Sequence, residues 1–240
     1  MKHYGLIGCP LGHSASADFF AKKFACEAID ADYTPYELAD VSEVETLRGR
    51  LSGFNVTIPY KQQIMPLLAS VSDEARAIGA VNCVKVNSSG AMHGYNTDVE
   101  GIRASLKDCG DLCGCDALVF GTGGAAAAVK YVLAEMDCHV TVVSRREGEG
   151  VISYDVLTAE DVKCARLLVN TTPLGMWPNV ETCPPIPYEA ITSNHTLFDV
   201  VYNPPMTGFL RRGAAVGART ISGEEMFRCQ AEASWRIWNE

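Results

Sequence analysis

The sequence predicts an α/β protein of two domains, each built around a sheet. Segments with strand-like patterns alternate with helix-like segments along the 240 residues, an order that is typical of parallel sheets covered by helices. In the second half, the glycine-rich turn GTGGAAAA, from Gly121 to Ala128, joins an apolar strand to an alanine-rich helix. A chain of this length can bury two modest hydrophobic cores.

The first part of the chain has the pattern of a mixed, mostly parallel sheet. Strands are expected at residues 4–8, 31–38, 54–58, 80–87 and 91–96. Helices are expected at residues 17–29, where phenylalanines recur at helical spacing, and at 41–51, 61–71 and 72–80. Because strands and helices alternate here, most neighbouring strands are expected to run parallel.

The second part has the pattern of a doubly wound nucleotide-binding domain. Strands are expected at residues 117–120, 140–143, 165–172 and 195–202, and an amphipathic helix at 223–240. The boundary is expected near Asp98 to Gly101, as a helix or a tight crossover. The predicted domains are residues 1–100 together with 222–240, and residues 101–221.

The stretch GFNVTIPYKQQ, residues 53–63, allows two interpretations. Apolar and polar residues alternate, and Pro59 should end the strand because it cannot donate to the ladder. In the first interpretation this is a half-buried strand followed by a solvated Lys61. In the second, Asn55, Thr57 and Lys61 form a row of donors that lines a pocket at the carboxyl end of the strand.

The glycine-rich turn predicts a dinucleotide site. Gly121, Gly123 and Ala126 fit the pattern G-x-G-x-x-G/A between a strand and a helix. Gly123 and Gly124 would let backbone N–H groups approach a pyrophosphate at the amino end of the helix, where the dipole favours anions. The alternative is a close-packed turn that binds no ligand. The complete strand–helix–strand unit around the turn favours the dinucleotide site over this alternative.

The end of the next strand favours NADP over NAD. An NAD enzyme usually places a carboxylate there to bind the ribose hydroxyls, but this chain has Ser144, Arg145 and Arg146. Arginine carries a permanent charge and a planar set of donors that suit a 2′-phosphate. Two solvated surface arginines are the alternative.

Composition excludes several function classes. Hydrophobic residues make up 48% and charged residues 20%, which are globular values, and the net charge of −9 argues against binding to nucleic acid or an anionic membrane. The chain has no apolar run long enough for a membrane span, and early glycine and proline residues interrupt any signal-peptide core. The cysteine cluster CGDLCGC, residues 109–115, lacks partners at zinc-like spacing, so no metal site is expected.

With its motifs in this order, the chain resembles the shikimate dehydrogenase family along nearly its whole length. The resemblance rests on GHSAS, FNVTIPYK, IGAVN, GYNTDVEG, GTGGAAAA, NTTPLGM, DVVYNPPMT and GEEMFRCQA. It implies an N-terminal substrate domain, a Rossmann-type NADP domain, and the NADPH-dependent reduction of 3-dehydroshikimate to shikimate, a step of chorismate and aromatic amino-acid biosynthesis. A cytoplasmic enzyme with a small-molecule substrate is expected, and the resemblance is compatible with a homodimer.

The resemblance also implies roles for individual residues. Lys61 and Asp98 match the pair that acts in proton transfer at the C3 oxygen of the substrate. Ser14 and Ser16 match the serines that bind the substrate carboxylate, and capping of the first helix is their alternative role. The other implied substrate-binding residues are Thr57, Asn82, Asp98, Tyr202 and Gln230. The implied cofactor-binding residues are Gly121, Thr122, Gly123, Gly124, Ala125, Ser144, Arg145, Arg146, Thr171, Pro173, Val200, Gly223, Met226 and Asp73.

The sequence departs from the usual family pattern at a few positions. Ala17 stands where a proline commonly follows S-x-S, and Cys83 where a threonine commonly follows A-V-N. Ser144 and Arg146 replace a usual asparagine and threonine, and the segment 147–161 is too short and glycine-broken for a complete helix. The adenine side of the cofactor site is therefore expected to be more open.

Three other functions stay open. The first is a quinate or quinate/shikimate dehydrogenase with relaxed use of NAD. The second is a non-catalytic NADP-binding regulator on the same fold, against which the presence of both Lys61 and Asp98 argues. The third is a protein-interaction module, which would leave the glycine-rich unit unexplained.

Overall fold

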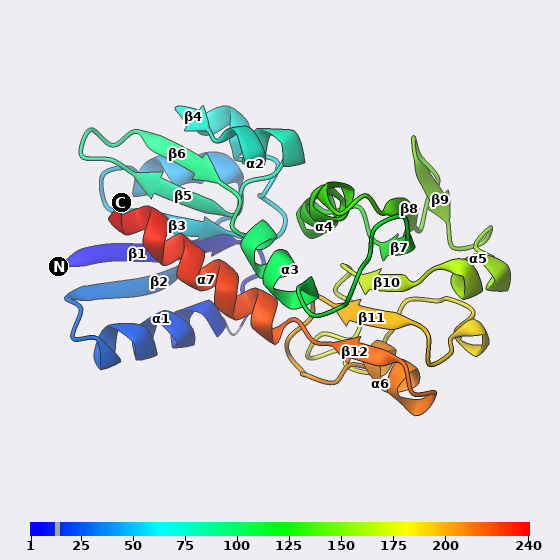
Figure 1. The fold of residues 1–240 in the computed structure, drawn as a ribbon. Coiled ribbons are helices and arrows are strands. Elements are labelled where there is room, and N and C mark those ends of the chain that lie inside the picture. The colour runs from blue at the N-terminus through cyan, green and yellow to red at the C-terminus, as the bar shows by residue number, and fades with distance from the viewer. Residues whose placement is uncertain (13–14) are drawn as a thin grey trace. The chain divides into compact units, whose positions relative to one another are not determined.

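The structure, a computed structural model, describes residues 1–12 and 15–240 (Figure 1). It divides into two compact units. Unit 1 comprises Met1–Thr97 together with Gln230–Glu240, and unit 2 comprises Asp98–Cys229. The expected limits were 100/101 and 221/222. The first observed limit lies slightly earlier in the chain, and the second falls inside the C-terminal helix α7 (Glu224–Asn239), whereas it was expected before that helix.

Unit 1 contains a mixed sheet with the strand order β2-β1-β3-β5-β6-β4. Strand β1 pairs in parallel with β2 and β3, whereas β5 pairs antiparallel with β3 and β6. The strands are β1 (Lys2–Gly8), β2 (Ala31–Glu37), β3 (Gly53–Val56), β4 (Ser70–Val71), β5 (Cys83–Val86) and β6 (Met92–Tyr95). The helices are α1 (Ala15–Cys26), the 3₁₀ helices η1 (Val41–Leu47) and η2 (Met65–Leu67), α2 (Asp73–Ile78) and the last part of α7.

Helices cover both faces of this sheet. On one face, an aromatic cluster joins α1 and α7 to β1, and the Tyr4 ring stacks on Trp238 at a centroid distance of 4.8 Å. Trp238 also donates from Nε1 to the Val84 carbonyl at 3.0 Å, and a Cβ at Gly53 would collide with its ring. On the other face, η1, η2 and α2 enclose a second cluster that includes Ile7, Phe54 and Ile64.

Unit 2 contains a fully parallel sheet with the strand order β12-β11-β10-β7-β8-β9. The strands are β7 (Asp116–Phe120), β8 (His139–Ser144), β9 (Val151–Ser153), β10 (Leu167–Asn170), β11 (Thr196–Asp199) and β12 (Arg219–Ile221). The helices are α3 (Asp98–Leu106), α4 (Gly124–Glu135), α5 (Ala159–Cys164), η3 (Tyr188–Ala190), α6 (Gly208–Ala215) and the start of α7. The predicted α/β class, with a mixed sheet followed by a doubly wound parallel domain, is confirmed.

Several predicted elements were wrong in type or length. Residues 61–71 do not form a helix: Pro66 opens η2, and the chain then runs along β6, with the Ala69 amide donating to the Met92 carbonyl at 2.9 Å. The helix expected at 41–51 is the shorter 3₁₀ helix η1, and the chain leaves it through Gly49 at φ +76°.

Two strands of unit 2 end earlier than their sequence patterns predict. Strand β10 ends at Asn170 and β11 at Asp199, because there the side chain of the last residue accepts a hydrogen bond from the backbone amide two residues further on. Asn170 Oδ1 accepts from the Thr172 amide at 3.1 Å, and Asp199 Oδ1 accepts from the Val201 amide at 3.0 Å. Both turns lie at the carboxyl edge of the sheet, where the candidate cofactor residues follow.

Candidate active site

The glycine-rich turn of unit 2 lies at the point where the strand order reverses. The chain proceeds from β7 to β8 and β9 on one side, and then returns to β10, β11 and β12 on the other. In open α/β sheets, ligands bind at the carboxyl ends of the strands at this point. Gly121 follows β7 directly, and its amide donates to the Val143 carbonyl of β8 at 2.9 Å. The turn is thereby fixed against both strands.

The glycines of this turn are needed for different reasons. Gly121 has φ +118°, and a Cβ there would lie 2.6 Å from Thr171 Oγ1, so both backbone and packing require glycine. Gly123 precedes α4 with φ −82°, and a Cβ there would meet nothing within 4 Å. No packing within the described part of the protein requires glycine at Gly123, so the position leaves open space in which a ligand could approach the backbone closely. The turn therefore fits a pyrophosphate at the amino end of α4.

The candidate 2′-phosphate residues lie at the end of β8. Ser144 is the last residue of β8, and Arg145 and Arg146 follow it with exposed side chains. The Ser144 carbonyl accepts from the Tyr154 amide at 3.0 Å, which brings the end of β9 beside these residues. Burial raises the pKa of Tyr154 to about 12, and the nearby positive charge of Arg145 opposes that rise. A cationic edge thus lies next to the glycine-rich turn.

The loops after β10 and β11 are joined by a buried carboxylate. Asp199 is fully buried and accepts from Asn170 Nδ2 at 3.0 Å, from the Val201 amide at 3.0 Å and from Thr207 Oγ1 at 2.6 Å. Burial raises the pKa of Asp199 to about 6, against the opposing effect of these three donors. Asp199 therefore fixes the relative positions of both loops and of the amino end of α6, where Thr207 is the cap.

The remaining candidate cofactor residues of unit 2 lie in or beside these loops. Thr171 donates from Oγ1 to the Phe120 carbonyl at 2.6 Å, which places it against the glycine-rich turn. The Val200 amide donates to the Asn170 carbonyl at 3.0 Å. A Cβ at Gly223 would collide with the Val200 carbonyl. Pro173 is exposed in the loop after β10, and Met226 is buried near the start of α7.

Three predicted residues belong to a different unit from the rest of their group: Asp73, Tyr202, and Asp98, which is the first residue of unit 2. Asp73 belongs to unit 1, at the start of α2, with a fully exposed side chain 4.0 Å from Arg76. Tyr202, expected with the substrate residues, belongs to unit 2, where its ring packs on Phe227 at 4.7 Å. Burial raises the pKa of Tyr202.

Unit 1 has its own reversal of strand order, between β1 and β3. The chain passes from β1 through α1 to β2 on one side, and β3 lies on the other side of β1. Ser16 lies in the first turn of α1, and Thr57 follows β3, its amide donating to the Ile7 carbonyl of β1 at 2.9 Å. Lys61 follows four residues later and is half-buried. Ser14 lies outside the described residues.

A buried hydrogen-bond network connects the other substrate candidates of unit 1. The Thr97 amide donates to Asn82 Oδ1 at 2.6 Å, and Thr97 Oγ1 lies 3.1 Å from Ser234 Oγ. Ser234 Oγ donates to the Gln230 carbonyl at 2.9 Å and accepts from Asn55 Nδ2 at 2.8 Å. The network therefore fixes Asn82 to Gln230 of α7 through side chains that are themselves satisfied.

Hydrogen bonds around Asn82 fix the backbone of Lys61 and of the residue before Asp98. Lys61 and Asp98 are the two members of the predicted proton-transfer pair. The Lys61 carbonyl accepts from the Val81 amide at 2.7 Å, one residue before Asn82. Asp98 follows Thr97 directly, begins α3, and has a side chain that is only 4% exposed. The backbone positions of Lys61 and of the residue before Asp98 are thus both set by the segment around Asn82.

Asn55 does not belong to a row of pocket donors, and that part of the second interpretation is wrong. Its side chain is 5% exposed and its amide is used internally: Nδ2 donates to Ser234 Oγ and, at 3.2 Å, to the Asn82 carbonyl, and Oδ1 accepts from Tyr33 at 2.9 Å. The half-buried strand of the first interpretation is also wrong, since every residue of β3 is buried.

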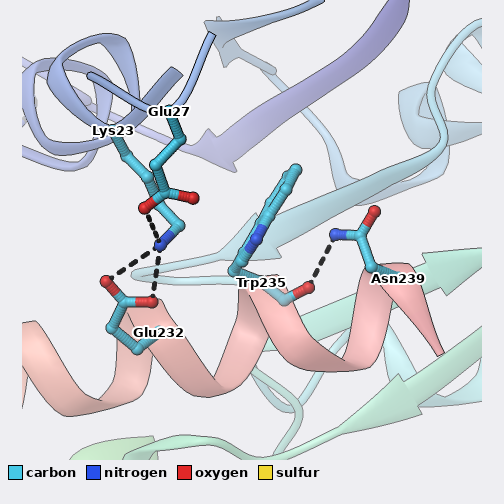
Figure 2. A network of polar contacts seen from close by, with 5 residues as sticks. All are labelled: Lys23, Glu27, Glu232, Trp235 and Asn239. Atoms are coloured by element: carbon cyan, nitrogen blue, oxygen red, sulfur yellow. Dashed lines mark hydrogen bonds and ion pairs between the residues drawn. The ribbon is translucent and has the colours of Figure 1, made fainter. Parts of the chain in front are cut away.

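An ion-pair network positions the helix that carries Ser16 (Figure 2). The Lys23 ammonium of α1 contacts Glu27 at 2.8 Å and Glu232 of α7 at 2.9 Å, with its side chain only 11% exposed. It also lies 6.0 Å from the centre of the Trp235 ring. Partial burial lowers the pKa of Lys23, but the bonds to both glutamates outweigh it, so the pKa is raised. The pair ties α1 to the turn of α7 that follows Gln230.

Sequence reasoning missed the residues that support this site. Tyr33, Thr97, Ser234, Asn170 and Asp199 act through other residues, and no spacing in the sequence identifies them. Thr97, Asn170 and Asp199 lie inside the motifs GYNTDVEG, NTTPLGM and DVVYNPPMT, which was the available signal. In the described part of the chain, no three His, Cys, Asp or Glu side chains are grouped to hold a metal ion, and no helix is long and apolar enough to span a membrane.

Comparison with known proteins gives a consistent result. Residues 6–84 match the family described as the shikimate dehydrogenase substrate binding domain. A shikimate dehydrogenase (NADP(+)) of Carboxydothermus hydrogenoformans is 35% identical over 254 residues, which cover 98% of this chain and 90% of the relative. The chain belongs to the shikimate dehydrogenase family. Its α/β fold, its two sheets and the Rossmann-type unit are those of this family.

Solved structures of the family align over nearly the whole chain. Shikimate 5-dehydrogenase from Thermus thermophilus, in complex with NADP(H) and shikimate, is 31% identical with a TM-score of 0.87, covering 99% of this chain and 93% of that one. Quinate dehydrogenase from Corynebacterium glutamicum, in complex with NAD, is 25% identical with a TM-score of 0.86, covering 99% and 93%. Fold similarity alone therefore does not separate shikimate from quinate activity.

Proposed function

We propose that this chain catalyses the reversible reduction of 3-dehydroshikimate to shikimate with NADPH, in the biosynthesis of chorismate and the aromatic amino acids. The observation that carries the proposal is the 35% identity to an NADP(+) shikimate dehydrogenase over 98% of the chain. The glycine-rich turn of unit 2 and the polar network of unit 1 supply the sites that this reaction requires.

In this proposal unit 1 binds the substrate and unit 2 binds the cofactor. The match of residues 6–84 to a substrate-binding domain supports the first assignment. The free space at Gly123 and the two arginines after β8 support the second. Ser14 and Ser16 would hold the substrate carboxylate with neutral donors. Thr57, Asn82 and Gln230, together with Asp98 of unit 2, would bind the ring hydroxyls, and Tyr202 of unit 2 would lie near the carboxylate.

The chain's own chemistry in the reaction is proton transfer. When bound, the nicotinamide supplies a hydride to the C3 carbonyl carbon of the substrate. Lys61 gives a proton to the C3 oxygen as it gains negative charge, and Asp98 is the carboxylate of the proton-transfer pair. In the reverse direction Lys61 accepts that proton. The half-buried position of Lys61 supports this role, because a partly desolvated ammonium interacts more strongly with a developing alkoxide.

The residues of unit 2 fit an NADP cofactor. Gly121, Thr122, Gly123, Gly124 and Ala125 would surround the pyrophosphate. Ser144, Arg145 and Arg146 would contact the 2′-phosphate, and the loops that carry Thr171, Pro173, Val200, Gly223 and Met226 would line the nicotinamide side. Asp73 has the weakest basis, since it belongs to unit 1 and is fully exposed.

A quinate dehydrogenase that uses NAD is the second candidate, favoured by the structural likeness to the Corynebacterium glutamicum enzyme. One assay separates the two: oxidation of shikimate and of quinate, each with NADP and with NAD, followed by absorbance of the reduced nicotinamide. The proposal requires shikimate with NADP to give the highest kcat/KM. A preference for quinate with NAD would establish the second candidate, and no turnover with any pair would leave a non-catalytic NADP-binding protein.

Two further assignments complete the proposal. A cytoplasmic location is supported by the membership of the chain in a biosynthetic family that uses NADPH, and cell fractionation tests it. A homodimer is proposed on the same family basis, and light scattering of the purified chain gives its mass. A mass near 25.9 kDa would refute the dimer.

A further inference from the structure

Two cysteine thiols meet at the amino ends of neighbouring strands of unit 2. Cys115 directly precedes β7 and Cys138 directly precedes β8, and Asp116 pairs with His139 as the first step of the parallel ladder. The Cys115 and Cys138 sulfur atoms lie 3.6 Å apart. Cys115 belongs to the cysteine cluster 109–115. No cysteine of this cluster has a role in the proposed reaction.

The backbone around the pair is fixed on both sides. The His139 amide donates to the Cys115 carbonyl at 2.8 Å, and the Gly114 amide donates to the Asp137 carbonyl at 3.1 Å. The Cys138 amide is held by the Leu133 carbonyl of α4 at 2.9 Å. The backbone hydrogen bonds of the paired strands therefore hold the two sulfur atoms close to each other.

The two thiols differ in environment. Cys115 is half-buried, whereas Cys138 is 9% exposed and donates from Sγ to the Leu112 carbonyl at 3.3 Å. Burial, followed by the neighbouring Cys115 sulfur, raises the pKa of Cys138 to about 12. Cys115 is thus the thiol that an oxidant in solution reaches first, and Cys138 is the thiol placed to react with the oxidised Cys115.

We propose that Cys115 and Cys138 form a redox-responsive dithiol that a peroxide closes to an intramolecular disulfide. The Cys115 thiol first loses its proton to solvent, and the thiolate attacks one peroxide oxygen. The O–O bond breaks, a sulfenic acid forms, and the leaving hydroxide takes up one proton from solvent to become the first water. The Cys138 sulfur then attacks the Cys115 sulfur, the S–O bond breaks, and the hydroxide leaves with the Cys138 proton as a second water. In total two thiols lose two electrons and two protons, and one hydrogen peroxide becomes two waters.

The geometry permits this closure without rearrangement of the sheet. Neighbouring strands lie about 4.8 Å apart, within the roughly 4.4–6.8 Å range of Cα separations that disulfides span. The sulfur atoms must approach by about 1.5 Å, from 3.6 Å to about 2.05 Å. Rotation about the Cα–Cβ bonds of the two cysteines can supply an approach of this size.

The disulfide would close a covalent loop that contains β7, the glycine-rich turn and α4. It would reduce the conformational freedom of the unfolded chain and so stabilise unit 2. The turn lies at the other end of β7 from Cys115, so oxidation leaves the turn itself unchanged. The proposed dithiol is therefore independent of the proposed reaction.

The test uses the full native chain, treated with one equivalent of hydrogen peroxide, alkylated and digested with trypsin without reduction. Cleavage after Lys107, Lys130 and Arg145 gives the peptides 108–130 and 131–145. We expect these two peptides to be linked, with fragment masses that assign the bond to Cys115 and Cys138. The link should vanish in Cys115→Ser and in Cys138→Ser. It should persist in Cys113→Ser, which alters an exposed thiol of the same peptide.

A second readout is thermal unfolding. The oxidised chain should unfold about 5–10 °C above the reduced chain, and this difference should be absent in Cys115→Ser. A bond from Cys113 or Cys109 to Cys138, a disulfide between two chains, or Cys138 that is fully alkylated after peroxide would each overturn the proposal. The linkage in the unaltered chain decides the question even if Cys138→Ser does not fold.

Discussion

The buried carboxylate of Asp199 should make the stability of unit 2 depend on pH, and asparagine at this position isolates that dependence. Burial raises the pKa of Asp199 to about 6 from the ordinary value of 3.8, although the donors Thr207, Val201 and Asn170 act in the opposite direction. The side chain has 0% exposure, so solvent does not screen it.

The sign follows from the direction of the shift. The folded state binds this proton more tightly than the unfolded state, so the stabilising contribution is complete below about pH 4 and is lost as the pH rises through about 6. The shift of about 2 pH units, at about 1.4 kcal/mol each, corresponds to about 3 kcal/mol of unfolding free energy in total, of which about 2 kcal/mol is lost between pH 4 and pH 7.

Asp199→Asn keeps the shape but cannot ionise. The amide oxygen can still accept from Asn170 and from the Val201 amide. The amide nitrogen would face Thr207, which must then accept where it now donates. That mismatch costs about 1–3 kcal/mol at every pH. The free energy of unfolding of the native chain minus that of Asp199→Asn should therefore fall by about 2 kcal/mol from pH 4 to pH 7.

Urea unfolding followed by circular dichroism at several pH values between 4 and 8 measures this difference. Asp155→Asn, an exposed aspartate of the same unit, serves as the control and should show a constant difference from the native chain. A difference for Asp199→Asn that stays constant within about 1 kcal/mol would refute the reasoning. A difference that increases with pH would show that the three donors outweigh the burial of the charge.

The remaining predictions concern the proposed reaction. Lys61→Ala should lower kcat by about 10² to 10⁴ with a much smaller change in KM. The control Lys163→Ala, which removes an exposed lysine of α5, should have the kcat of the native chain. A normal kcat of Lys61→Ala at saturating shikimate would exclude proton transfer by Lys61. Arg145→Ala should weaken NADP binding by about tenfold to over a hundredfold and leave NAD binding nearly unchanged in titration calorimetry, and equal weakening of both would show that Arg145 does not contact the 2′-phosphate. Ser16→Ala should mainly raise KM for shikimate, because the substrate carboxylate is unchanged during the reaction; a fall in kcat at constant KM would contradict this role.

The sequence was sufficient for the parts of the fold that depend on local pattern. The glycine-rich turn, the apolar strand before it and the alanine-rich helix after it predicted β7 and α4 closely, because glycine spacing and apolar periodicity both have a direct backbone cause. The same holds for α7, whose apolar residues recur at helical spacing.

The sequence was insufficient where tertiary contacts decide the outcome. Residues 61–71 are apolar enough for a helix, but pairing with β6 was available and Pro66 disfavoured a continuous helix. Asn55 looked like a pocket donor because its neighbours alternate, yet its partners Tyr33 and Ser234 are 22 and 179 residues away. No local pattern reports partners at such distances.

The site candidates divide in the same way. Motif positions such as Lys61 and Gly123 could be named from the sequence, because each motif places its own residues at one strand end. The residues that support them, such as Thr97 and Asp199, act through bonds between separate segments. Their role became visible only when those bonds were known.

The position of the unit boundary inside α7 has a consequence for the order in which the protein is made. Unit 2 is one continuous stretch, residues 98–229, whereas unit 1 needs residues 230–240 in addition to 1–97. A ribosome therefore supplies every residue of unit 2 before it has supplied Ser234, the partner of Asn55, or Trp238, which packs over Gly53. The unit that is begun first during translation is the one that is completed last.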